Sequence, residues 1–231
     1  MFAMKPNRIP TATVAFAALA IAFGVAAPAS AASEAMYGDP VAAGGYWHQQ
    51  QYDDCVLMSS ADVIGQITGE SPSEAAIIDK AHSTPSVVHG GPIYSMPANP
   101  DDPNSGAGAS MADVPALLAR YRVAAVVIDR DDRAVNGIRS GIAGLKQALG
   151  GGHKVIASVN AEIIWHEPVD ARDKGGNPAS DHAVVVTGVD AGRGIVHLND
   201  SGIAEGRDEQ VPIDLFVRAW DASDELMVVT L

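Results

Sequence analysis

Cys55 is the only cysteine in this chain of 231 residues, and it stands where a helix is expected to begin. Asp53 and Asp54 precede it and can cap a helix start, and Gly69 is placed to end the helix. The unpaired N–H groups and the dipole of a first helical turn favour the thiolate, the nucleophilic form of cysteine. Gln49 lies six residues upstream, where its amide could fold back beside the thiol. The alternative is a buried, unreactive cysteine.

A nucleophilic cysteine needs a base, and the base needs a group that orients it. His182 begins a strongly apolar segment, residues 182–189, directly after a polar loop. The next apolar segment, residues 194–199, ends in Asn199 and Asp200. A hairpin of two such strands would bring His182 and Asp200 to the same sheet edge. Taken separately, these residues are equally consistent with a local hydrogen bond at His182 and turn chemistry at Asn199 and Asp200.

The spacing of these residues is that of papain-type enzymes. His182 follows Cys55 by 127 residues, and Asp200 follows it by 145. A cysteine near the mature N-terminus, with His and Asn or Asp roughly 130 to 150 residues downstream, is typical of that layout.

Three short motifs in this order also resemble a known family. They are Gln49 six residues before Cys55 at a helix start, the run Asp181-His182-Ala183-Val184-Val185-Val186-Thr187-Gly188, and Leu198-Asn199-Asp200. Together they resemble papain-like peptidases related to the bacteriocin-leader-processing proteases, which cleave after a double glycine. The resemblance covers about residues 46–231. Val56 and Ser201 depart from it, because the family usually has a glycine after the cysteine and a proline after Asn-Asp.

The resemblance implies a role for each motif residue. Cys55 would be the nucleophile, His182 the general base and acid, and Asp200 the residue that orients the imidazole. Gln49 and the Cys55 backbone N–H would form the oxyanion hole, and Asn199 is the alternative third member, since papain itself uses asparagine. The reaction would be acyl transfer on a peptide or protein substrate, with no cofactor and no metal.

The N-terminus predicts export. Residues 1–31 have the basic Lys5 and Arg8, an apolar run over residues 12–27, and a small-residue cleavage site at Ala29-Ser30-Ala31, as in a secretory signal peptide. Without it the formal charge is near −15, which argues against nucleic acid and anionic membranes as partners. We therefore expect a secreted or cell-envelope protein without stable membrane insertion. A lone cysteine cannot form an internal disulfide in that oxidising space.

The elements that must position the site predict an α+β domain. Residues 32–46 are expected to be an irregular arm, and residues 47–231 a papain-like domain, in a stand-alone exported form. Its N-terminal helices, including the central one with Cys55, would pack on a mostly antiparallel sheet. Expected helices are 55–68, 72–83 with Ser71 as N-cap, 110–122, 137–149 and 212–220. Expected strands are 123–129, 154–164, 182–189, 194–199 and 226–231. Two long loops, 84–108 and 165–180, are expected to wall the cleft.

Three other interpretations compete. A cell-wall amidase or endopeptidase would use the same nucleophile, with His197 in place of Asp200 as the third residue. A non-catalytic exported binding protein could keep the fold, and Val56 favours it. A metal site is a weaker alternative, because neither acidic group has the spacing of a calcium loop. Those groups are His48, Asp53 and Asp54, and Asp129, Asp131 and Asp132.

Overall fold

The protein's structure is a computed structural model, which describes residues 35–99 and 105–231. The predicted signal peptide, residues 1–31, lies outside the described residues. A seven-stranded sheet has the order β2-β7-β3-β4-β5-β6, with β1 paired to β4, and all of these pairs are antiparallel. The strands are β1 (Met36–Gly38), β2 (Ala125–Ile128), β3 (Val155–Val159), β4 (His182–Asp190), β5 (Ile195–Asn199), β6 (Glu209–Pro212) and β7 (Met227–Thr230).

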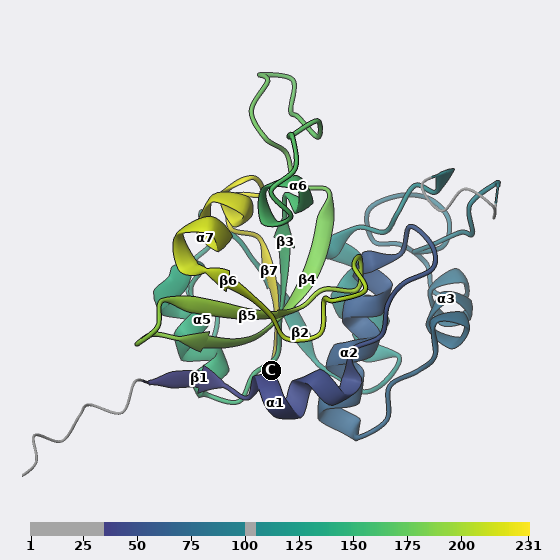
Figure 1. The fold of residues 1–231 in the computed structure, drawn as a ribbon. Coiled ribbons are helices and arrows are strands. Elements are labelled where there is room, and N and C mark those ends of the chain that lie inside the picture. Colours follow the sequence, from purple (N-terminus) through teal and green to yellow (C-terminus); the bar gives the residue numbers. More distant parts are fainter. Residues whose placement is uncertain (1–34, 100–104) are drawn as a thin grey trace, which may run out of the picture. The chain divides into compact units, whose positions relative to one another are not determined.

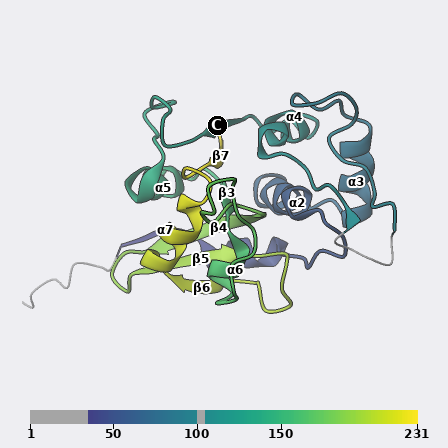
Figure 2. The ribbon, with the colours of Figure 1, turned by 90° about the horizontal axis from the view of Figure 1, so that it is seen from above.

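Helices cover both faces of this sheet, as Figure 2 shows. The α-helices are α1 (Pro40–Ala43), α2 (Cys55–Thr68), α3 (Glu74–His82), α4 (Val114–Ala119), α5 (Gly141–Gly150), α6 (Ala161–Ile164) and α7 (Ile213–Asp221). The central strand β4 alternates between two cores. Ala183 and Val185 pack with α2, α3 and α4, whereas Val184 and Val186 pack with α5 and α7. The predicted α+β class is therefore confirmed.

Helix α2 is the buried helix that the sequence predicted. It begins at Cys55, and eleven of its residues, Cys55 to Gly65, are buried. It ends where Gly69 adopts a left-handed φ of 86°, which glycine takes without steric cost. The Ser59 hydroxyl donates a 3.1 Å hydrogen bond to the Ala183 carbonyl, one residue after His182. The helix that carries the cysteine is thus fastened to the strand that carries the histidine.

The structure corrects four local expectations. The irregular arm is ordered where it is described, because it forms β1, α1 and a 3₁₀ turn at Gly44–Tyr46. Helix α3 is capped by Ser73, which accepts from the Ala76 N–H, and not by Ser71. The expected strand 154–164 stops at Val159, since the Asn160 side chain caps α6.

The fourth correction concerns β6, which the sequence analysis missed. Glu209–Pro212 pairs with β5, so Pro212 is the N-cap of α7 and not its first helical residue.

Among the described residues, no helix combines the length and the hydropathy that crossing a membrane requires.

Candidate active site

Cys55 sits at the N-terminal end of α2, where the sequence placed it. It is 9% exposed, and it lines a cleft. Its own N–H and that of Val56 belong to the first turn, where helical N–H groups have no intrahelical acceptor. Within residues 35–99 and 105–231, neither N–H has a hydrogen-bond partner. Two free donors therefore lie beside the thiol, available to a developing negative charge.

His182 and Asp200 form the second half of the site. His182 Nε2 lies 2.7 Å from Asp200 Oδ1, and both residues are buried. Because the carboxylate accepts, Nε2 carries the proton, and Nδ1 is the ring nitrogen left for the Cys55 thiol. The hairpin of β4 and β5 thus brings the two residues to one sheet edge, as expected from their spacing. Cys55, His182 and Asp200 form one cluster.

The Asp200 carboxylate is fixed by two further donors. The Gly202 N–H donates to Oδ1 at 2.7 Å, and the Trp165 indole N–H donates to Oδ2 at 2.9 Å. The Trp165 ring also packs against the His182 ring, with centroids 5.3 Å apart. Sequence reasoning missed Trp165, since it placed this residue only at the start of a polar loop.

The segment that leads into α2 is bound to the segment that follows β5. The Trp47 indole donates to the Asp200 carbonyl at 2.6 Å. The Gln50 N–H donates to the Ser201 carbonyl at 2.9 Å, and the Ser201 hydroxyl donates to Gln50 Oε1 at 2.7 Å. Ser201, which departs from the family pattern, therefore links the cysteine-bearing and aspartate-bearing halves of the site.

The electrostatics of the cluster favour an ion pair. Burial opposes a charge on His182, but the Cys55 thiolate and the Asp200 carboxylate outweigh it, so that the His182 pKa is raised well above its ordinary value. Burial likewise opposes the charge on Asp200, yet hydrogen bonds and the His182 charge hold the pKa of that carboxyl below its ordinary value. A protonated imidazole beside an acceptor thiolate is the arrangement that cysteine nucleophiles need.

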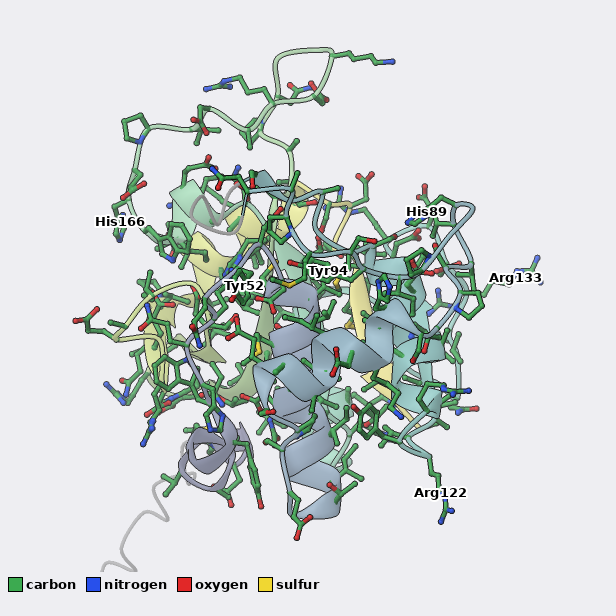
Figure 3. All side chains as sticks on the ribbon, turned by 90° about the vertical axis from the view of Figure 1, so that its right-hand side faces the viewer. Tyr52, His89, Tyr94, Arg122, Arg133 and His166 are labelled. Atoms are coloured by element: carbon green, nitrogen blue, oxygen red, sulfur yellow. The ribbon has the colours of Figure 1, made fainter. Side chains whose placement is uncertain are left out.

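The cleft beside Cys55 and His182 has a volume of about 470 Å³. Residues from both expected wall loops line it, Gly106 to Gly108 from one and Ser180 from the other. Most of the loop at 165–180 projects away from the sheet in Figure 1, and Figure 3 shows His166 on it. Only the end of that loop next to β4 therefore contributes to the cleft.

Gln49 is not brought to the thiol. It is exposed and lines a different hollow, between the segment before α2 and the start of α3. The neighbouring Gln50 side chain is bound elsewhere, because its Nε2 donates to the Tyr52 carbonyl and its Oε1 accepts from the Ser201 hydroxyl. Among the described residues, no glutamine lines the cleft beside Cys55.

The two alternative third members also lie elsewhere. The Asn199 amide donates to the Ala43 carbonyl at 3.0 Å and to Asp62 Oδ2 at 2.7 Å, toward α2. His197 Nδ1 lies 2.6 Å from Asp208 Oδ1. Asp200 is thus the member of these three whose side chain contacts His182, and neither Asn199 nor His197 replaces it.

Two buried acids near the site were not predicted. Asp54, the N-cap residue of α2, has both carboxyl oxygens buried without a partner among the described residues. Burial, followed by repulsion from Glu74 and Asp53, raises its pKa to about 8. Glu209 has one buried, unpartnered oxygen, and burial with repulsion from Asp200 raises its pKa to about 7. No sequence signal distinguishes these acids from solvated ones.

A known crystal structure confirms the fold. A crystal structure from Bacillus anthracis, of a protein designated a C39-like peptidase, aligns with a TM-score of 0.54 and 20% identity over 81% of this chain and 95% of that chain. A double glycine motif protease from an AMS/PCAT transporter, in complex with its leader peptide, aligns with a TM-score of 0.44 and 13% identity over 79% and 88% of the two chains. The chain has the papain-like fold of C39 peptidases.

Sequence relatives are much closer. No family model matches the chain. Uncharacterized proteins of Mycobacterium tuberculosis (Rv1268c) and Mycobacterium bovis are each 61% identical to it over 220 residues, which are 95% of either sequence. The chain belongs to the family of these uncharacterized mycobacterial proteins.

Proposed function

We propose that this protein is a thiol hydrolase that cleaves amide bonds in peptides. The observation that carries the proposal is the 2.7 Å contact between His182 Nε2 and Asp200 Oδ1 in a cleft that also holds Cys55 at a helix N-terminus. Burying a His–Asp pair costs desolvation free energy, so stability alone gives little reason for it. A pair that leaves His182 Nδ1 facing the Cys55 thiol is better explained by a chemical role of the imidazolium.

The mechanism follows from the placement of each group. The Cys55 thiolate attacks the substrate carbonyl, and the C=O electron pair moves onto oxygen. The N–H groups of Cys55 and Val56 are the donors for this oxyanion, in place of the expected Gln49 amide. His182 Nδ1 gives its proton to the leaving amine as the C–N bond breaks. It then takes a proton from water, which hydrolyses the thioester and frees the Cys55 thiolate.

Alkylation of Cys55 as a function of pH tests the proposal. Because Cys55 is the only thiol, iodoacetamide reports on it alone. We expect reaction below pH 7 in the folded protein, and loss of that low-pH reaction in His182→Ala. His197→Ala is the matched control, since it also removes a buried histidine paired with an aspartate. A thiol that reacts only on unfolding, or with the same pH dependence in all three proteins, would refute the proposal.

Two observations favour a second candidate function. Gln49 lines a different hollow from the one beside Cys55, and Val56 lines the cleft where the resembling family has glycine. Both features suit a protein that binds a peptide in the papain-like cleft without hydrolysing it. A reactive thiolate with no turnover of any peptide in a combinatorial mixture would favour this candidate.

We also propose that the protein acts outside the cytoplasm, on the support of the signal-like residues 1–31. N-terminal sequencing of the protein from the envelope and culture fractions tests this. A mature N-terminus near Ala32 is expected, and an intact Met1 in the cytosolic fraction would contradict it.

A further inference from the structure

The cleft beside Cys55 is lined by apolar residues and by two acids. Its apolar lining comes from α2, β2, β4 and the segments before α4 and β7, whereas its charged side chains other than His182 are both carboxylic acids. The apolar residues are Val56, Ala107, Ala109, Met111, Ala112, Val127, Ala183 and Leu226, and the acids are Asp53 and Asp181. Among the described residues, no lysine or arginine lines the cleft.

Asp53 is built into one wall. It lies two residues before Cys55, is half-buried, and accepts a hydrogen bond from the Gly108 backbone. The loop packs closely on it, because a Cβ at Gly106 would lie 3.1 Å from Asp53 Oδ2. Burial raises the pKa of Asp53, although the Gly108 hydrogen bond and the His182 charge oppose this rise. Its carboxyl is thus partly removed from water, and the His182 charge offsets part of the cost of ionising it.

Asp181 is held on the other side, directly before His182. Its Oδ1 accepts a 2.9 Å hydrogen bond from the Ala161 N–H at the start of α6. Asp181 is exposed, and its Oδ2 has no protein partner among the described residues. Each acid is therefore oriented by a backbone donor, and the pair flanks the two residues that would do the chemistry.

We propose that this cleft selects peptides with a lysine or arginine side chain next to the scissile bond, a substrate class that rests on the proposed function. Such a side chain has an apolar stem and a cationic head. The stem would lie on the Val127 and Leu226 surface, and the head would pair with Asp53 or Asp181. A glutamate at the same position would place a like charge against both acids and is disfavoured.

Cleavage of a matched peptide set tests this preference. Each series of peptides varies one residue next to the scissile bond among Lys, Arg, Gln and Glu, and kcat/KM is measured at pH 7. At one position we expect Lys or Arg to exceed Glu by roughly tenfold or more and Gln to fall between, with the preference shrinking at high salt. Asp181→Asn keeps the acceptor for the Ala161 N–H, and it should lower the Lys-to-Gln ratio about threefold.

Asp214→Asn is the matched control. Asp214 is an exposed acid on α7, on the opposite face of the sheet from α2, so its loss of charge should leave the Lys-to-Gln ratio unchanged. Equal kcat/KM values for Lys and Glu peptides at every position would overturn the inference and leave the hydrolase intact. An equal fall of the ratio in both variants would also overturn it, because the effect would then be one of net charge.

Binding to Cys55→Ala separates this inference from the proposed function. Fluorescence anisotropy with labelled Lys and Glu peptides measures selection without chemistry. Tighter binding of the Lys peptide, with no hydrolysis by the wild type, would sustain the cleft specificity while the hydrolase fails. No difference in binding, or no binding of either peptide, would overturn the specificity.

Discussion

The Trp165 indole N–H donates to Asp200 Oδ2 at 2.9 Å, the carboxylate oxygen that His182 does not contact. The same ring packs against the His182 imidazole. Trp165 therefore restrains both members of the pair, the acid by a hydrogen bond and the base by contact. It lies just after α6, and the end of β3 fixes the start of that helix through Asn160.

Trp165→Phe should separate these two contributions. The substitution keeps an aromatic ring against His182 but leaves Asp200 Oδ2 without its donor, at a cost of about 1.5 to 3 kcal/mol for a hydrogen bond to a charged group. We expect Cys55 alkylation below pH 7 to slow by about tenfold, because a less restrained Asp200 stabilises the imidazolium less. Stopped-flow alkylation across pH 5 to 9 measures this.

Trp47→Phe is the control for Trp165→Phe, because it removes an indole bond to the Asp200 carbonyl and not to the carboxylate. It should lower the free energy of unfolding and leave the shape of the alkylation profile unchanged. If the two variants shift the pH profile of Cys55 alkylation equally, Trp165 affects the thiol only through the stability of the fold.

The candidate site could be predicted from the sequence where local rules decide the geometry. A cysteine after two acids and before an apolar helical pattern fixes the start of α2. Two apolar segments joined by a tight turn fix the register that brings His182 to Asp200, since antiparallel strands meet at their opposite ends. Both inferences need only the periodicity of the apolar residues and the direction of the strands.

The remainder depends on chain path and tertiary packing. Gln49 was misplaced because residues 47–54 are irregular, and their course is set by bonds to the Asp200 segment, about 150 residues away. The short edge strand β6 was missed because it carries Glu209 and Gln210 and lacks the alternation of apolar and polar residues that predicts a strand. Trp165 was missed because its partner is distant in sequence.

Asp200→Asn should destabilise the protein in a defined pH window. Asp200 has a lowered pKa. Its contribution to the free energy of unfolding is therefore complete above its ordinary pKa of 3.8 and is lost as pH falls through the lowered pKa. His182 has a raised pKa. Its contribution to the free energy of unfolding is therefore complete below its ordinary pKa of 6.5 and is lost as pH rises through the raised pKa. Between these limits we expect a loss of about 3 kcal/mol in urea unfolding, and a smaller loss at pH 3.

Asp208→Asn is the matched control for Asp200→Asn, because Asp208 pairs with the buried His197. It should also destabilise the protein, yet leave the low-pH alkylation of Cys55 intact, whereas Asp200→Asn should abolish it. Retention of that reactivity in Asp200→Asn would mean that the negative charge of Asp200 is not needed for the low-pH thiolate.

The stability of Glu209→Gln relative to the wild type should be greater at pH 8 than at pH 4. Glu209 pairs with Leu198 across β5 and β6, which puts it on the same face as Asp200 and diagonal to it. Its pKa is raised to about 7 by burial and by Asp200, with His182 opposing, so wild-type stability falls as pH rises from its ordinary 4.5 toward 7. Glutamine removes this loss, and a relative gain of about 1 kcal/mol at pH 8 is expected in urea titrations, allowing for partial exposure. An identical difference at both pH values would mean that Glu209 does not titrate in this range.

Asp54→Asn tests why an acid stands unpaired at the start of the helix that carries Cys55. Asp54 is the N-cap of α2, but its side chain accepts no capping hydrogen bond, and the Leu57 and Met58 N–H groups bond to its carbonyl instead. Figure 3 shows Tyr52 and Tyr94 at this end of α2, and the Tyr94 hydroxyl is also buried without a partner among the described residues. Because burial raises the pKa of Asp54 to about 8, wild-type stability falls as pH rises from its ordinary 3.8 toward 8.

The neutral amide that replaces the Asp54 carboxyl escapes that penalty. We expect Asp54→Asn to gain roughly 2 kcal/mol over the wild type between pH 4 and pH 8 in urea unfolding, with helix α2 intact by circular dichroism. Asp79→Asn, at an exposed carboxyl on α3, should show no such gain. A wild-type advantage that grows with pH would mean that Asp54 is ionised and paired in the folded protein. The acid before Cys55 would then add negative charge at the thiol, where a neutral carboxyl leaves the helix N-terminus free to favour the thiolate.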